Sequence, residues 1–79
     1  MLVDVVLFGS YSRLLPSESA KGRATLSLEE PATVDQVLDL LQLPPEGRTY
    51  VTLNGEQVGL DTRVSEADEI RVVVPLGGG

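Results

Sequence analysis

The sequence predicts an α+β fold in which a mixed sheet of four to five strands packs on one main helix. Two apolar runs, residues 2–8 and 70–74, are rich in valine, which favours strands. A single stretch, residues 34–41, repeats its apolar residues with helical spacing. The dipeptide Asn54-Gly55 is typical of a two-residue hairpin turn, because both of its residues tolerate positive φ.

The first two strands are predicted at residues 2–8 and 23–28. The first has apolar residues on both faces, which suits a central strand. The second alternates between apolar and polar residues, which is typical of a half-buried strand, so the two should pair as a hairpin. Residues 9–22 mix glycine, serine and proline and are predicted to be a long turn or loop between them.

The helix is predicted from its start signal and its apolar stripe. Thr33 is a suitable N-cap and Gln36 stands at the third helical position, so the pair can form a reciprocal capping box. Pro44-Pro45 should end the helix, because the residue before a proline is disfavoured in the α conformation. The stripe follows the i, i+3, i+4, i+7 spacing and consists of Val34, Val37, Leu38 and Leu41.

The remaining strands are predicted to be short. Residues 50–53 and 56–58 flank Asn54-Gly55, which we interpret as turn chemistry alone. Val64 should point into the core, and the last strand is predicted at residues 69–74. The order strand, strand, helix, strand, short strand, strand, with one helix crossing a mixed sheet, is the β-grasp (ubiquitin-like) arrangement.

Composition argues against several classes of function. The chain has no cysteine and no histidine, so thiolate chemistry and the commonest general base are missing. Its twelve acidic residues are spread along the chain without metal-ligand spacing. We therefore expect no enzyme active site, no metal site and no bound cofactor. The net charge of −6 would repel phosphate backbones and anionic lipids, so neither nucleic acid nor membrane is an expected partner, and a cytoplasmic location is expected.

The last five residues, Pro75-Leu76-Gly77-Gly78-Gly79, differ from the rest of the sequence. Pro75 lacks an amide hydrogen, so the sheet should end there, and a single domain is predicted over residues 1–75. The glycines have no side chains, so residues 76–79 are expected to form a flexible glycine tail that carries an α-carboxylate. Such a tail is either a frayed terminus or a slim thread that enters a partner protein.

This combination resembles the ubiquitin-like (MoaD/ThiS-like) sulfur carriers, the family of the molybdopterin synthase small subunit and the thiamine-pathway sulfur carrier. The resemblance covers the whole chain, and the family commonly ends in two glycines where this sequence has three. It rests on Val5-Val6-Leu7-Phe8 followed by Arg13, Thr33-Val34, Val51-Thr52-Leu53-Asn54-Gly55-Glu56, Asp68-Glu69-Ile70 and Pro75-Leu76-Gly77-Gly78-Gly79.

The resemblance implies that the protein is a cosubstrate and not an enzyme. An adenylating enzyme of the ubiquitin-activating type would use ATP to form an acyl-adenylate at Gly79, and a sulfur donor would convert it to a thiocarboxylate. The tail would then enter the large subunit of an acceptor synthase. The residues expected to contact these partners are Phe8, Arg13, Val73, Pro75, Leu76, Gly77 and Gly78.

Other interpretations of these residues and of the chain stay open. Phe8 is alternatively a core residue, Arg13 a solvated surface residue, and Val73 part of a second buried layer. For the pathway, molybdopterin synthesis is the first expectation and the thiazole of thiamine the second. The chain is alternatively a protein modifier joined through Gly79 to target lysines, or a noncovalent interaction module.

Overall fold

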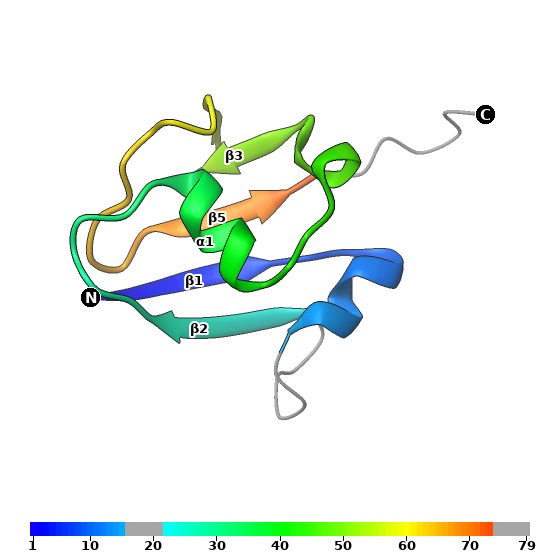
Figure 1. The fold of residues 1–79 in the computed structure, drawn as a ribbon, viewed down its shortest axis with the longest axis horizontal. Coiled ribbons are helices and arrows are strands. Elements are labelled where there is room, and N and C mark those ends of the chain that lie inside the picture. The colour runs from blue at the N-terminus through cyan, green and yellow to red at the C-terminus, as the bar shows by residue number, and fades with distance from the viewer. Residues whose placement is uncertain (16–21, 74–79) are drawn as a thin grey trace.

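The structure, a computed structural model, describes residues 1–15 and 22–73 (Figure 1). Within these residues it contains a five-stranded mixed sheet, one α-helix against one face of that sheet, and two short 3₁₀ helices in the connections. The predicted β-grasp arrangement is confirmed. The elements are β1 (Leu2–Val6), η1 (Gly9–Leu14), β2 (Arg23–Ser27), α1 (Val34–Leu40), η2 (Pro45–Arg48), β3 (Val51–Leu53), β4 (Glu56–Gln57) and β5 (Glu69–Val72).

The first and last strands lie side by side in the middle of the sheet. The strand order is β2-β1-β5-β3-β4. β1 runs parallel to β5, with Val5 opposite Ile70, and the other three pairings are antiparallel. Because β1 and β5 are parallel, the segment that follows β1 and the end of β5 lie at the same end of the sheet (Figure 1).

The core lies between α1 and the sheet. Val5 and Ile70 on the strands and Val37 and Leu38 on the helix are fully buried, because each projects into this layer. All four residues of the predicted apolar stripe are buried, and so is Val64, as expected. The remaining buried members of this core are Val3, Leu7, Leu15, Ala24, Leu28, Ala32, Leu43, Val51 and Val72.

The start of α1 is stabilised both locally and by a distant loop. The Gln36 amide donates to Thr33 Oγ1 at 3.3 Å and the Thr33 amide donates to Gln36 Oε1 at 2.8 Å, so the predicted capping box is confirmed. The amides of Val34 and Asp35 have no acceptor within the helix. They donate to the carbonyls of residues 62 and 60, each at 2.9 Å, so the 59–64 connection completes the cap.

The end of α1 corrects the prediction that Pro44-Pro45 stops the helix. The helix ends earlier, at Leu40, because Gln42 takes a φ of 60°. The Gln42 amide donates to the Asp39 carbonyl at 3.0 Å and the Leu43 amide donates to the Leu38 carbonyl at 3.1 Å. These two bonds are those of a Schellman motif, which turns the chain so that Leu43 enters the core.

Other boundaries also differ from the predictions. β2 ends at residue 27 instead of 28, β4 at residue 57 instead of 58, and β5 at residue 72, while residue 74 lies outside the described residues. β1 ends at Val6 instead of Phe8, and the predicted 9–22 loop contains η1, which begins where Gly9 takes a φ of 58°. β3 begins at Val51 instead of Tyr50. Asn54 and Gly55 have φ values of 54° and 91°, so the predicted two-residue turn with positive φ at both positions is confirmed.

Candidate functional site

Exposed apolar side chains gather on the open face of the sheet, at the end where β5 stops. Val73 follows β5 directly, and its amide donates to the Tyr50 carbonyl at 2.9 Å, which places the two residues beside each other. The exposed fractions of Phe8, Tyr50 and Val73 are 43%, 47% and 38%. Apolar side chains at this exposure contribute little to the core, and together they form an exposed apolar surface beside the end of β5. We call Phe8, Tyr50 and Val73 the open-face patch.

Phe8 belongs to this surface because of its place in the strand alternation. Val3, Val5 and Leu7 point toward α1, so Phe8, one residue later, points to the face that no helix covers. The interpretation of Phe8 as a core residue is therefore wrong. Its ring centroid lies 6.0 Å from the guanidinium carbon of Arg71, two residues before Val73 on β5, which joins the patch to that strand.

Charged residues frame the patch along β1, β2 and β5. Arg71 contacts Glu69 at 3.4 Å, and Arg23 on β2 reaches both Glu69 and Asp4, the latter at 3.3 Å. The two positive charges of the arginines equal the two negative charges of the carboxylates, so this network adds no net charge to the face. Its members are partly solvent-exposed, and such pairs contribute little stability.

A shallow hollow of about 620 Å³ adjoins Val73 on the same face. It is lined by Thr52, Asn54, Gly55, Glu69, Arg71 and Val73. Because amide, carboxylate and guanidinium groups line it next to an apolar side chain, it suits the polar rim of a protein interface.

The Asn54 side chain also binds residues outside the turn, so the interpretation of Asn54-Gly55 as turn chemistry alone is incomplete. Its side-chain amide donates to Asp68 Oδ1 at 2.9 Å, and its Oδ1 accepts the Glu69 amide at 2.9 Å. The hairpin is thereby tied to the start of β5. This holds the strand that leads into the tail.

Arg48 anchors the segment that leads into Tyr50. Its Nη1 donates to Asp35 at 2.6 Å and to Asp39 at 2.7 Å, and its Nε donates to the Leu43 carbonyl at 3.0 Å. Burial lowers the pKa of the Arg48 guanidinium, but the hydrogen bonds and charges of Asp39 and Asp35 outweigh that effect, so the pKa is raised above its ordinary value. The Arg48 guanidinium therefore stays charged across the physiological pH range.

The structure brings together only some of the predicted site residues. Val73 lies on the surface and does not face a second buried layer, and Phe8 lies near it. Arg13 is exposed in η1, at the same end of the sheet, without a described contact to either residue (Figure 1). The predicted residues Pro75, Leu76, Gly77, Gly78 and Gly79 lie outside the described residues.

Sequence reasoning missed Tyr50 and Arg71. The signal for Arg71 was its spacing of two residues from Val73, which places both on the same face of a strand. Tyr50 has no such signal, because its position depends on the pairing of β3 with β5. The described residues contain no group of three or more acidic side chains placed to hold a metal ion. No helix in the described ranges is long and apolar enough to span a bilayer.

Comparisons with known proteins agree with this fold. The model of the ThiS family matches residues 5–79. SAMP1 from Haloferax volcanii is similar in structure, with a TM-score of 0.74 and 20% identity, and the match covers 100% of both chains. A putative molybdopterin converting factor subunit 1 from Pyrococcus furiosus gives a TM-score of 0.71 and 20% identity, over 95% of this chain and 98% of the other.

A third similar structure is part of a complex. It comes from the complex of subunits 1 and 2 of the molybdopterin-converting factor of Helicobacter pylori, with a TM-score of 0.62, 20% identity and coverage of 100% of both chains. No curated protein sequence matches this chain. At this identity the structural similarities support the fold, which is that of β-grasp, ubiquitin-like proteins.

Proposed function

This chain belongs to the ThiS family, and on that premise we propose that it is a sulfur carrier whose Gly79 carboxyl is converted to a thiocarboxylate. The observation that carries the proposal is the family match, which runs through the final glycines to residue 79. A terminal carboxylate is ionised at neutral pH and is a poor electrophile, so it needs activation by another protein. An adenylating enzyme that uses ATP supplies this activation in the proposal.

The proposed reaction needs no catalytic side chain from this protein. A carboxylate oxygen of Gly79 attacks the α-phosphate of ATP, and pyrophosphate leaves. A sulfide ion (HS⁻) released by the sulfur donor then attacks the acyl carbon, AMP leaves with the bonding electrons, and loss of the sulfur-bound proton leaves the thiocarboxylate. The thiocarboxylate sulfur then bonds to an acceptor, and water attacks the acyl carbon, so that the carbon–sulfur bond breaks and the carboxylate is regenerated. The protein is therefore proposed to act as a cosubstrate, which agrees with a chain that lacks cysteine and histidine.

We further propose that the open-face patch docks the partners of the tail. Phe8, Tyr50 and Val73 are exposed and adjoin the end of β5, so a partner that contacts them also receives residues 74–79. The adenylating enzyme and the large subunit of an acceptor synthase would use this surface in turn. The assembly of subunits 1 and 2 in the Helicobacter pylori complex supports the second of these partners.

The test of the carrier chemistry is the intact mass of the protein. The full chain is incubated with ATP, a sulfur source and an adenylating enzyme that loads other members of the family. We expect a mass gain equal to the replacement of one oxygen by sulfur, mapped to Gly79 by fragmentation. The matched control is a chain without Gly78 and Gly79, which should gain nothing. If another carrier is loaded under these conditions and the intact chain is not, the proposal is wrong.

For the acceptor, molybdopterin is our first proposal and the thiamine thiazole the second. The similarity to the molybdopterin converting factor subunits supports the first, and the family match supports the second. Adding the loaded chain to each purified acceptor synthase would decide between them. Product should form with one synthase and not with the other.

A second candidate function is protein modification through Gly79. The similarity to SAMP1, which is described as small archaeal modifier protein 1, supports it. Denaturing gels of cell extracts would then show tagged chain in conjugates that resist thiol reduction. Truncation of Gly78 and Gly79 should abolish both functions, so the conjugates are what separate the two candidates.

A further inference from the structure

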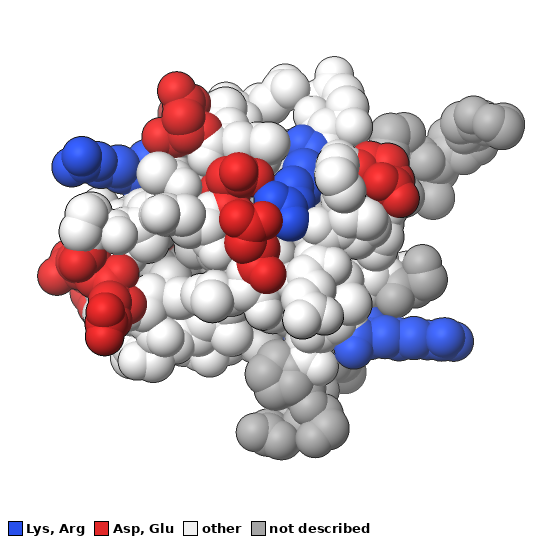
Figure 2. Space-filling model, viewed as in Figure 1, with Lys and Arg blue, Asp and Glu red and all other residues white. Residues whose placement is uncertain are grey.

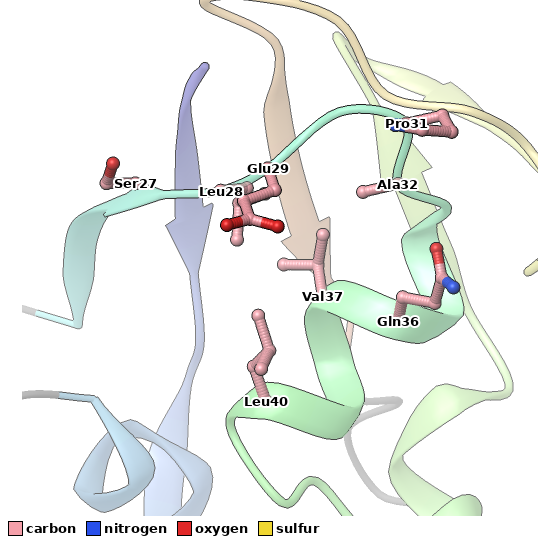
Figure 3. Close-up of a pocket in the computed structure, with 8 residues that line it drawn as sticks. All are labelled: Ser27, Leu28, Glu29, Pro31, Ala32, Gln36, Val37 and Leu40. Carbon is pink, nitrogen blue, oxygen red and sulfur yellow. The ribbon is translucent and has the colours of Figure 1, made fainter.

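A second surface, on the helix side of the sheet, has the features of a binding groove. A pocket of about 380 Å³ opens between the end of β2, the connection to α1 and α1 itself. Figure 3 shows Val37 and Leu40 pointing from α1 toward Leu28 and Glu29. Val37 and Leu28 are buried at its floor, whereas Leu40 is 67% exposed. Leu40 is therefore an apolar side chain that the fold leaves uncovered at the rim.

Within the part of the chain that the structure describes, the backbone of β2 beside this groove has an open edge. β2 is the outermost strand of the sheet. The Leu28 amide donates to the Met1 carbonyl and the Leu7 amide donates to the Gly22 carbonyl. The backbone N–H and C=O groups of the even-numbered residues of this segment therefore point toward β1. The backbone groups of the odd-numbered residues Thr25 and Ser27 consequently point away from the sheet. Ser27 also lines the pocket, so the open edge and the groove are continuous.

The charge around the groove is negative. Glu29 lines it, Glu30 follows, and both side chains are exposed without a described basic partner. Figure 2 shows acidic side chains at the edge of the molecule where the connection enters α1, whereas those over α1 lie beside a basic side chain. Asp35 and Asp39 of α1 pair with Arg48, so the uncompensated charge at the groove is that of Glu29 and Glu30. An occupant with basic residues beside its apolar residues would be attracted to this rim, whereas an acidic one would be repelled.

From these three observations we propose that an extended segment of a partner protein adds to β2 as a sixth strand. The segment carries an aliphatic side chain with Lys or Arg beside it. Its backbone pairs with Thr25 and Ser27, its aliphatic side chain packs against Leu40, and its basic residues face Glu29 and Glu30. Strand addition to an open sheet edge is a common mode of peptide recognition.

This groove is separate from the open-face patch. The groove lies on the face that α1 covers, whereas Phe8 and Val73 lie on the opposite face. A protein bound at the groove therefore leaves the open-face patch accessible. In this arrangement the carrier is recruited to a partner while its tail enters another active site.

The experiment is an NMR titration of the full-length, ¹⁵N-labelled chain. The probe is the acetylated and amidated peptide Lys-Thr-Val-Ile-Val-Thr-Lys. We expect the largest shift changes at the amides of Thr25, Ser27 and Leu40, and slower hydrogen exchange at Thr25 and Ser27 on binding. The same peptide with both lysines replaced by glutamate should bind about threefold to tenfold more weakly.

Two variants distinguish binding at the groove from nonspecific binding of the peptide. Leu40→Arg should weaken binding by about tenfold or more, because it removes the apolar contact and adds a like charge. The matched control is Leu2→Arg, the same change at a residue that is half exposed on the open face, and it should change binding by less than about twofold. The spectrum of each variant reports whether it is folded.

Three outcomes would overturn the proposal. They are no saturable binding at millimolar peptide, shift changes confined to β4 or the open-face patch, or equal binding by the Leu40→Arg and Leu2→Arg variants. Loading of sulfur at Gly79 should be the same in all three chains, because none of these substitutions lies in the tail.

Discussion

On the face of the sheet that α1 covers, Val5, Ile70 and Val72 are fully buried, whereas on the opposite face Phe8 and Val73 stay exposed. Both sets are apolar residues of the same two neighbouring segments. The difference is what lies above them, since only one face has a helix packed on it. Apolar side chains on the covered face stabilise the fold. On the open face Val6 is also buried, whereas Phe8 and Val73 remain available to a partner.

The largest effect that this comparison predicts is on α1 itself. Leu38 is fully buried and Leu40 is exposed, although both stand on the same helix. Leu38→Ala should lower the free energy of unfolding by about 3 kcal/mol, because it removes a transfer contribution and leaves a cavity. Leu40→Ala should change it by less than about 0.5 kcal/mol. Urea unfolding of the two variants checks this, and equal midpoints would contradict it.

A second prediction compares two adjacent valines whose side chains lie on opposite faces of the sheet, Val72 and Val73. Val72→Ala should cost about 2 kcal/mol of unfolding free energy, whereas Val73→Ala should cost less than about 0.5 kcal/mol. Binding to the adenylating enzyme should respond in the reverse order, with a loss of about fivefold for Val73→Ala and little change for Val72→Ala. Calorimetric titration measures the binding. If Val73→Ala binds normally, the open-face patch does not include Val73.

The same comparison extends to charged residues. The Arg48 side chain is only 12% exposed and contacts Asp35 and Asp39, whereas Arg23, on the open face, is about half exposed. Arg48→Ala should cost about 1 to 2 kcal/mol, because it leaves the Leu43 carbonyl without its donor. Arg23→Ala should cost less than about 0.5 kcal/mol. Thermal unfolding in low and high salt would test this, and the two variants should not lose the same stability.

The smallest predicted effect concerns backbone conformation. Gln42 and Asn54 both have positive φ, a conformation that asparagine tolerates better than glutamine. Gln42→Gly should therefore raise the free energy of unfolding by about 0.5 kcal/mol, whereas Asn54→Gly should lower it, because the bonds to Asp68 and Glu69 are lost. Denaturant midpoints compare the two, and a destabilised Gln42→Gly variant would contradict the first expectation.

Local signals in the sequence predicted much of the fold. The capping box of Thr33 and Gln36, the apolar stripe of α1 and the Asn54-Gly55 turn depend on residues close together in the chain, so they could be inferred without a structure. The end of α1 could not be inferred, because Gln42 adopts positive φ without the usual glycine, and the burial of Leu43 accompanies that turn. For Val73, partner contact was predicted and burial in a second layer was left open, and its exposure in the structure rules out the buried layer.

By itself, the sequence determined the fold class, the presence of the five strands and of α1, and the family resemblance, because alternation, helix caps and terminal glycines are local patterns. It did not determine the 3₁₀ helices or all of the element ends. Only the tertiary structure decided which apolar residues remain exposed. Phe8 and Leu7 are neighbours of similar hydrophobicity, but Leu7 is buried and Phe8 is exposed, because α1 covers the face toward which Leu7 points. Tyr50 lies beside Val73 through strand pairing, and Leu40 lines one pocket with the end of β2 because α1 packs on the sheet. Such contacts join residues that are distant in sequence, so no local pattern encodes them.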